Sequence, residues 1–189
     1  AIDSRQVRQS DVFFALQGDN TDGHEYLNKA QDSGAVAAVV ERFIESALPQ
    51  VRVKNSGAAL GQLGAHFRDK LTGTVIGITG SAGKTSVKNL VRALLEQFGS
   101  VSATAGNLNN ELGVPLTLAS VPVATDYVVV ERGAAQQGDI AYLVDIAKPA
   151  ISLVNNVGAA HVGRFGSIET TAKTKGEIYS RLGQGDTAV

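Results

Sequence analysis

Short apolar runs alternate with amphipathic stretches along residues 73–189. The runs predict parallel strands, and the stretches between them predict helices. In chain order we expect strand Val75–Thr79, helix Lys84–Phe98, strand Val101–Ala103, strand Tyr127–Glu131, helix Ile140–Ala147, strand Ala150–Val154, helix Ile168–Leu182 and a strand beginning at Thr187. A loop rich in glycine and asparagine is expected between the strands at 101–103 and 127–131. This alternation predicts an α/β fold with a parallel sheet covered on both faces.

Residues 1–72 predict a smaller α/β region. Its expected elements are strand Val12–Leu16, helix Glu25–Ser33, strand Ala35–Val40, strand Val51–Val53 and helix Ala58–Leu71. Leu60, Leu63, Phe67 and Leu71 recur at helical spacing in the last of these, which indicates a face turned toward a core. Gly73 is suited to end that helix. We therefore expect two domains, residues 1–72 and 73–189.

Composition narrows the class of protein. The net charge of −1 gives no reason to expect a nucleic-acid partner or an anionic membrane surface, and the apolar runs are too short to span a bilayer. The sequence contains no cysteine, which excludes disulfides and thiolate catalysis and suits a reducing cytoplasm. There is also no methionine, so we expect a processed or trimmed chain.

The most informative segment is Val75–Ser86, in which a strand leads through glycines into Lys-Thr and a helix. Gly80 and Gly83 allow backbone amides to approach phosphate oxygens, and the helix directs its positive end at the same anion. Lys84 adds a mobile charge, and Thr85 offers a hydroxyl to Mg²⁺. The segment predicts a phosphate-binding loop, although its glycine spacing is tighter than the common one.

Other polar residues follow the expected strands. They are Asn107–Asn110, Glu131 and Asn155–His161. The carboxyl ends of parallel strands lie at one edge of a sheet, where ligands bind. A phosphate loop together with a carboxylate and a histidine predicts metal-assisted phosphoryl transfer.

Several segments resemble the Mur ligases, which build peptidoglycan precursors. Thr79–Lys88 resembles their ATP loop. Ala105–Thr117 resembles the corresponding loop in the members of the family that add D-Ala-D-Ala. Asn155–His161 and Ala172–Ile178 continue the match. Asp3–Arg5 and Asp22–His24 resemble a UDP-sugar-binding domain.

The resemblance implies a fold, a reaction and partners. It implies a small N-terminal UDP-sugar-binding domain followed by a P-loop-type ATP-binding domain, with the family's third domain absent from this chain. ATP and Mg²⁺ would activate the carboxylate of UDP-MurNAc-tripeptide as an acyl phosphate, which the amine of D-Ala-D-Ala would attack. We expect a cytoplasmic monomer, and we expect this fragment alone to be inactive. A sister ligase adding a diamino acid, or a nucleotide-binding module without catalysis, stays open.

The resemblance also assigns roles to residues. Nucleotide contacts fall on Gly80, Ser81, Ala82, Gly83, Lys84, Thr85, Ser86, Asn107 and Asn110. The metal ligands would be Thr85, Glu131, His161 and Lys175, the catalytic residues Lys84, His161 and Lys175, and the substrate contacts Ser4, Arg5 and His24. The asparagines could instead form turns, and Arg5 could instead form a surface ion pair.

Two further features of the second region concern charged residues, namely which helix lysine is modified and what Arg132 contacts. One helix lysine is carbamylated in the family, and its spacing from an apolar-aromatic pair favours Lys175 over Lys173. Arg132 stands where the family usually has an apolar residue after the strand glutamate. A charged side chain at the end of a buried strand is expected to reach solvent or an acidic partner.

Overall fold

The computed structural model describes residues 1–18, 21–158 and 166–189. The chain forms two compact units, Ala1–Leu60 and Gly61–Val189, and each contains a parallel sheet with helices. The α/β class predicted from the sequence is therefore confirmed. Helix α2 (Ser56–Lys70) begins in the first unit and ends in the second. The expected domain boundary at residue 72 stays a prediction.

The first unit is built on three parallel strands in the order β1-β2-β3. They are β1 (Val12–Phe14), β2 (Ala37–Val40) and β3 (Gln50–Arg52), with the 3-10 helix η1 (Gly23–Tyr26) and helix α1 (Leu27–Asp32) between β1 and β2. Phe13 lies opposite Ala38, and both pack with Leu27 of α1 in one apolar core. The expected strands and the helix are all present, with shifted ends.

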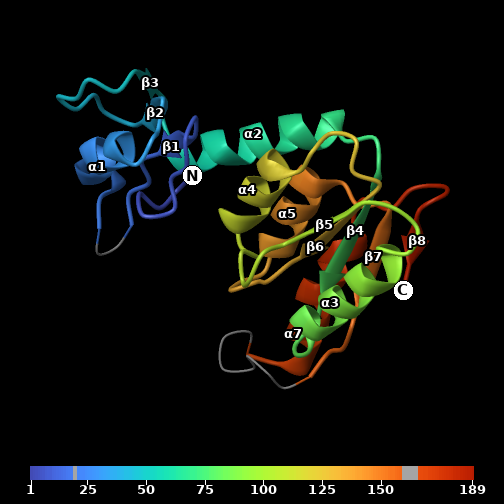
Figure 1. Cartoon of the computed structure of the whole chain (residues 1–189). Helices are drawn as coiled ribbons and strands as arrows, with labels where there is room; N and C mark the ends of the chain where they lie inside the picture. The colour runs from blue at the N-terminus through green and yellow to red at the C-terminus, as the bar shows by residue number, and fades with distance from the viewer. Residues whose placement is uncertain (19–20, 159–165) are drawn as a thin grey trace. The chain divides into compact units, whose positions relative to one another are not determined.

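The second unit has a five-stranded parallel sheet in the order β5-β6-β4-β7-β8 (Figure 1). The strands are β4 (Thr74–Thr79), β5 (Val101–Ala103), β6 (Tyr127–Glu131), β7 (Ile151–Val154) and β8 (Thr187–Ala188). Strand β4 is central and pairs with both β6 and β7. Because all strands are parallel, their carboxyl ends share one edge of the sheet.

Helices cover both faces of this sheet. Helix α3 (Lys84–Leu95) packs with Ile76, Ile78 and Val129 on one face. Helices α4 (Gly113–Ser120) and α5 (Asp139–Ala147) pack with Val128 and Val130 on the other. Successive strand residues point to opposite faces, so the almost unbroken apolar runs are explained by burial on both sides.

The structure corrects two expected elements. Helix α4 lies within a segment that we expected to be a loop. The sequence did not predict this helix, because Val114 and Leu118 are not accompanied by a polar stripe and because Pro115 suggests a break. Proline is tolerated in the first turn of a helix, and this one lies there. The helix expected at Ile168–Leu182 is also shorter, since α7 (Ile168–Gly176) gives way to the 3-10 helix η2 (Glu177–Tyr179).

Among the described residues, we find no helix with both the length and the apolar character needed to cross a membrane.

Candidate functional site

The loop between β4 and α3 has the geometry of an anion-binding turn. Gly83 precedes the first residue of α3 and adopts a left-handed conformation, with φ of 71°, which favours glycine. The first amides of α3 have no carbonyl partner within the helix and carry its positive dipole end. Lys84 donates from Nζ to the Gly80 carbonyl at 2.9 Å, so its ammonium group lies over the loop.

The end of β7 holds this loop in place. The Asn156 side chain accepts from the Ala82 amide at 3.0 Å and donates to the Ala82 carbonyl at 3.0 Å. Asn155 donates to the same carbonyl at 2.8 Å, and the Ser81 hydroxyl accepts from the Gly158 amide at 3.0 Å. Ser81 is thus tied to the scaffold, whereas Ala82 and Ser86 are exposed. These bonds fix the loop before any ligand binds, which lowers the cost of binding.

Glu131 is the centre of a polar cluster at the carboxyl edge of the sheet. It is only 2% exposed, and its carboxylate accepts from the Thr85 hydroxyl at 3.0 Å and from the Asn109 amide at 2.8 Å. A hydroxyl and a carboxylate beside a phosphate loop are oxygen donors of the kind that Mg²⁺ prefers. Within residues 1–18, 21–158 and 166–189, no three His, Cys, Asp or Glu side chains cluster as metal ligands. Mg²⁺ commonly takes few protein ligands beside phosphate, so the donor set fits it.

Lys88 belongs to the same cluster, although the sequence analysis gave it no role. Its Nζ lies 3.4 Å from Glu131 Oε2 and donates to the carbonyls of Thr104 and Gly106. The signal was its spacing, because Lys88 follows Lys84 by four residues on one helix face.

The asparagines after β5 differ in what their side chains do, because one contacts Glu131 and another caps a turn. Asn109, which we did not single out, contacts Glu131, whereas Asn107 is exposed. Asn110 accepts from the Gly113 amide at 2.9 Å near the start of α4, and it also lines the pocket described next. Which of these asparagines reaches Glu131 depends on the path of the loop, so the sequence could not select between them.

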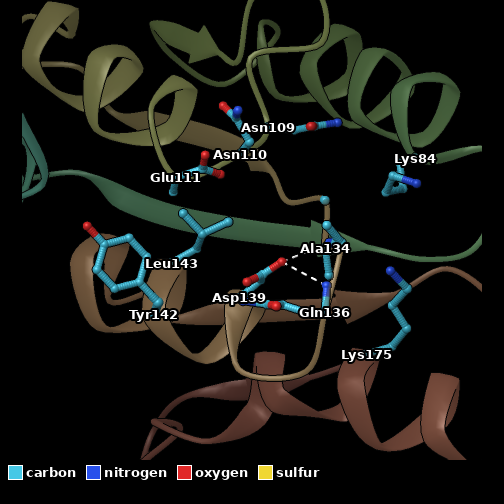
Figure 2. A pocket seen from close by; sticks show the side chains of 12 residues that line it. Lys84, Asn109, Asn110, Glu111, Ala134, Gln136, Asp139, Tyr142, Leu143 and Lys175 are labelled. Carbon is cyan, nitrogen blue, oxygen red and sulfur yellow. Dashed lines mark hydrogen bonds between the residues drawn. The ribbon is translucent and has the colours of Figure 1, made fainter. Parts of the chain in front are cut away.

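A pocket of about 820 Å³ opens at this edge of the sheet (Figure 2). Lys84 and Lys175 lie at one end of the view, and Tyr142 and Leu143 lie at the other. The wall between them includes Gly133–Gln136, a segment ordered by Asp139, whose carboxylate accepts from the amides of Ala135 and Gln136. The pocket therefore joins the phosphate loop to a space large enough for part of a substrate.

Lys175 reaches this pocket from a buried position on α7, with 2% exposure. Burial lowers the pKa of its ammonium group, the charge of Lys84 lowers it further, and Glu177 opposes the change. Lys173, by contrast, is exposed.

Arg132 does not behave as expected. Its side chain is 0% exposed, and Nε, Nη1 and Nη2 have no hydrogen-bond partner among the described residues. The guanidinium lies against Gly77 of β4, where an added Cβ would be 2.3 Å from Nη1. Burial lowers the pKa of Arg132 to about 9. For the described part of the chain, the expectation of solvent or an acidic partner was wrong.

Two of the three predicted substrate residues of the first unit, Arg5 and His24, already have partners. The Arg5 guanidinium contacts Asp3, with Nη2 to Oδ2 at 2.8 Å. His24 is buried, and its Nδ1 lies 2.6 Å from Asp22 while its Nε2 accepts from the Glu41 amide at 2.9 Å. Ser4 is buried at 5% exposure. His161 lies outside the described residues.

Comparison with known proteins identifies the family. Residues 1–68 match the Mur ligase family catalytic domain, and residues 78–189 match the Mur ligase middle domain. The chain belongs to the Mur ligase family. The resemblance drawn from the loop segments is thereby confirmed.

Three relatives show which Mur ligases this chain is similar to. UDP-N-acetylmuramoyl-tripeptide–D-alanyl-D-alanine ligase of Escherichia coli (strain K12) is 43% identical over 187 residues, which are 99% of this chain and 41% of the relative. A solved UDP-N-acetylmuramoylalanyl-D-glutamyl-2,6-diaminopimelate–D-alanyl-D-alanyl ligase from Acinetobacter baumannii has a TM-score of 0.90 and 36% identity, over all of this chain and 42% of that one. MurF ligase from Thermotoga maritima, solved with ADP, has a TM-score of 0.88 and 36% identity, over all of this chain and 44% of that one. The chain thus spans well under half the length of these relatives.

Proposed function

We propose that this chain is part of an ATP-dependent ligase that joins D-Ala-D-Ala to UDP-MurNAc-tripeptide. The observation that carries the proposal is the position of the phosphate loop and Glu131 beside a pocket that contains both Lys84 and Lys175. The relatives named for this reaction match the chain over nearly its whole length, which supports the same assignment.

The phosphate loop would hold ATP. Amides of residues 80–86 would contact its phosphates, and Lys84 would exchange the Gly80 carbonyl for a phosphate oxygen. The relative solved with ADP supports this role for the loop. Thr85 and Glu131 would hold Mg²⁺, which offsets phosphate charge when bound.

The reaction then proceeds in two displacements. A carboxylate oxygen of the tripeptide attacks the γ-phosphorus of ATP, ADP leaves, and an acyl phosphate forms. The amine of D-Ala-D-Ala attacks the carbonyl carbon, the carbon–oxygen bond to phosphate breaks, and the nitrogen loses a proton. Lys84 lies in the pocket where the growing negative charge must be offset.

Lys175 is proposed as the carbamylated lysine. Carbamylation needs a neutral amine, and the lowered pKa of Lys175 increases that form near neutral pH. Its burial beside the pocket supports the choice of Lys175 over exposed Lys173. His161 is proposed as a further metal ligand on the family resemblance alone.

The first unit is proposed to bind the UDP-sugar part of the substrate through Ser4, Arg5 and His24. Arg5 is the best placed of the three, because it is exposed and could exchange Asp3 for a diphosphate. We further propose a monomeric enzyme of the cytoplasm.

Binding discriminates this function from its alternatives. Calorimetric titration of the 189-residue chain should show tighter binding of UDP-MurNAc-tripeptide than of UDP-MurNAc-dipeptide. Preference for the dipeptide would support a sister ligase that adds a diamino acid. Binding of Mg·ADP with neither UDP-sugar would support a nucleotide-binding module and would contradict the proposal.

A further inference from the structure

Arg132 is a buried cation that the proposed chemistry does not use. It is the largest of the fully buried side chains, and its three guanidinium nitrogens lack hydrogen-bond partners among residues 1–18, 21–158 and 166–189. Burying a charge without a partner is strongly unfavourable. A conformation that gave the guanidinium an anion would therefore be favoured over the one observed.

The backbone of Arg132 stands at the rim of the pocket. The next two residues, Gly133 and Ala134, line it. Arg132 directly follows β6, and its guanidinium lies against Gly77, the residue paired with Val130. Arg132 is therefore on the same face of the sheet as Val130, which packs in one cluster with the pocket residue Leu143. Rotation of the arginine side chain away from Gly77 would therefore bring the guanidinium toward the pocket.

The guanidinium of Arg132 can lie against Gly77 because glycine has no side chain. A Cβ there would lie 2.3 Å from Nη1 and 3.0 Å from Cζ of Arg132, so any larger residue would displace the guanidinium. Glycine 77 lies in the middle of a strand and its φ is not positive, so its backbone does not require glycine. The room for Arg132 depends on this one position.

We propose that Arg132 is a substrate-binding residue, whose guanidinium turns from Gly77 into the pocket and binds a carboxylate of the peptide. This inference rests on the proposed function. A peptide such as alanyl-glutamyl-diaminopimelate, named for one relative, has carboxylates besides the one that is activated. Lys84 and Lys175 lie beside the phosphate loop, so Arg132 would hold a carboxylate that does not react.

The chemistry of the guanidinium suits this partner. Its planar donors match the two oxygens of a carboxylate, and charge-assisted pairs of this kind are strong when water is excluded. Binding would also remove the unpaired buried charge of the free state. The residue would thus add specificity for an acidic peptide over a neutral one.

Arg132→Met, which keeps length but removes charge, tests the proposal in the 189-residue chain. Titration with UDP-MurNAc-tripeptide should show affinity lower by about 10- to 100-fold, as expected for loss of a charge-assisted pair. An analogue with its unreacting carboxylates converted to carboxamides should bind wild type and Arg132→Met equally. Exposed Arg92→Met is the matched control and should bind both compounds as wild type does. The melting temperature of ligand-free Arg132→Met should rise, because an unpaired buried charge has been removed.

Gly77→Ala gives an independent test with the opposite sign. The new Cβ fills the space of the guanidinium, so affinity for the tripeptide should exceed that of wild type. If Gly77→Ala does not fold, the comparison of tripeptide and carboxamide in Arg132→Met decides alone.

Equal affinity of wild type and Arg132→Met for the tripeptide would overturn the inference and leave the proposed function intact. A wild-type chain that binds Mg·ADP but not the tripeptide would overturn both. A purely structural arginine would show a lower melting temperature in Arg132→Met and no difference between the two compounds.

Discussion

Lys88 and Glu131 form a buried ion pair, with Nζ 3.4 Å from Oε2 and side chains 4% and 2% exposed. The pair joins α3 to the end of β6, directly behind the phosphate loop. It leaves Lys84, one turn earlier, pointing at the loop. Two lysines four residues apart on one helix therefore have different tasks, one in holding the site together and one in contacting the ligand.

Lys84→Ala and Lys88→Ala should separate these tasks. Lys84→Ala should weaken Mg·ADP binding strongly and leave the melting temperature close to wild type. Lys88→Ala should lower stability by about 3–5 kcal/mol, because it leaves Glu131 buried without its cation. Calorimetry and thermal unfolding on both variants check this. Equal affinity losses at equal stability would contradict the assignment of Lys84 to phosphate.

Glu131→Gln tests the proposed Mg²⁺ site. The amide keeps the volume but loses the charge, so Mg·ADP binding should need a higher Mg²⁺ concentration. In a complete enzyme carrying this sequence, turnover should fall by about 10-fold or more. Glu111→Gln, which changes an exposed carboxylate of the same pocket, is the control. An unchanged Mg²⁺ dependence in Glu131→Gln would remove this residue from the metal site.

Lys175→Ala should abolish turnover of such a complete enzyme, and short carboxylic acids should partly restore it. The added acid would replace the carbamate anion in the space left by the buried side chain. Lys173→Ala should keep nearly full activity, because that side chain is exposed. Rescue of Lys173→Ala instead would show that the other lysine carries the modification.

Asp22 should make the first unit sensitive to acid. Hydrogen bonds from Arg42 and from the His24 amide lower the pKa of Asp22 in the folded state. A carboxyl whose folded pKa lies below its unfolded value of 3.8 stabilises the fold above that pH, and this stability is lost as pH falls toward the folded pKa. Asp22→Asn should therefore show a smaller drop in melting temperature than wild type between about pH 5 and about pH 2. Parallel pH profiles would contradict this.

Much of the second unit follows from the sequence, because short apolar runs buried on both faces mark parallel strands. The phosphate loop also follows, since glycine, lysine and the strand-to-helix change all fall in register. Helix α4 does not, because its buried apolar surface lacks the polar stripe that reveals an amphipathic helix.

Contacts between distant segments could not be predicted in the same way. The choice of Asn109 over its neighbours depends on loop direction, and the burial of Lys88 depends on carbonyls near β5 that sequence spacing does not place. Arg132 shows the same limit most clearly. The charge of Arg132 predicted a polar partner. Its side chain instead packs against Gly77, which lies 55 positions earlier in the chain, on β4.

If ATP activates a peptide carboxylate before the amine attacks, an oxygen atom must pass from the peptide to phosphate, and isotope labelling measures this transfer. UDP-MurNAc-tripeptide labelled with ¹⁸O in the reacting carboxylate would be turned over with ATP and D-Ala-D-Ala by a complete enzyme carrying this sequence. We expect the released phosphate to contain an ¹⁸O atom from the peptide, and we expect its release to require D-Ala-D-Ala. Unlabelled phosphate accompanying amide formation would contradict it.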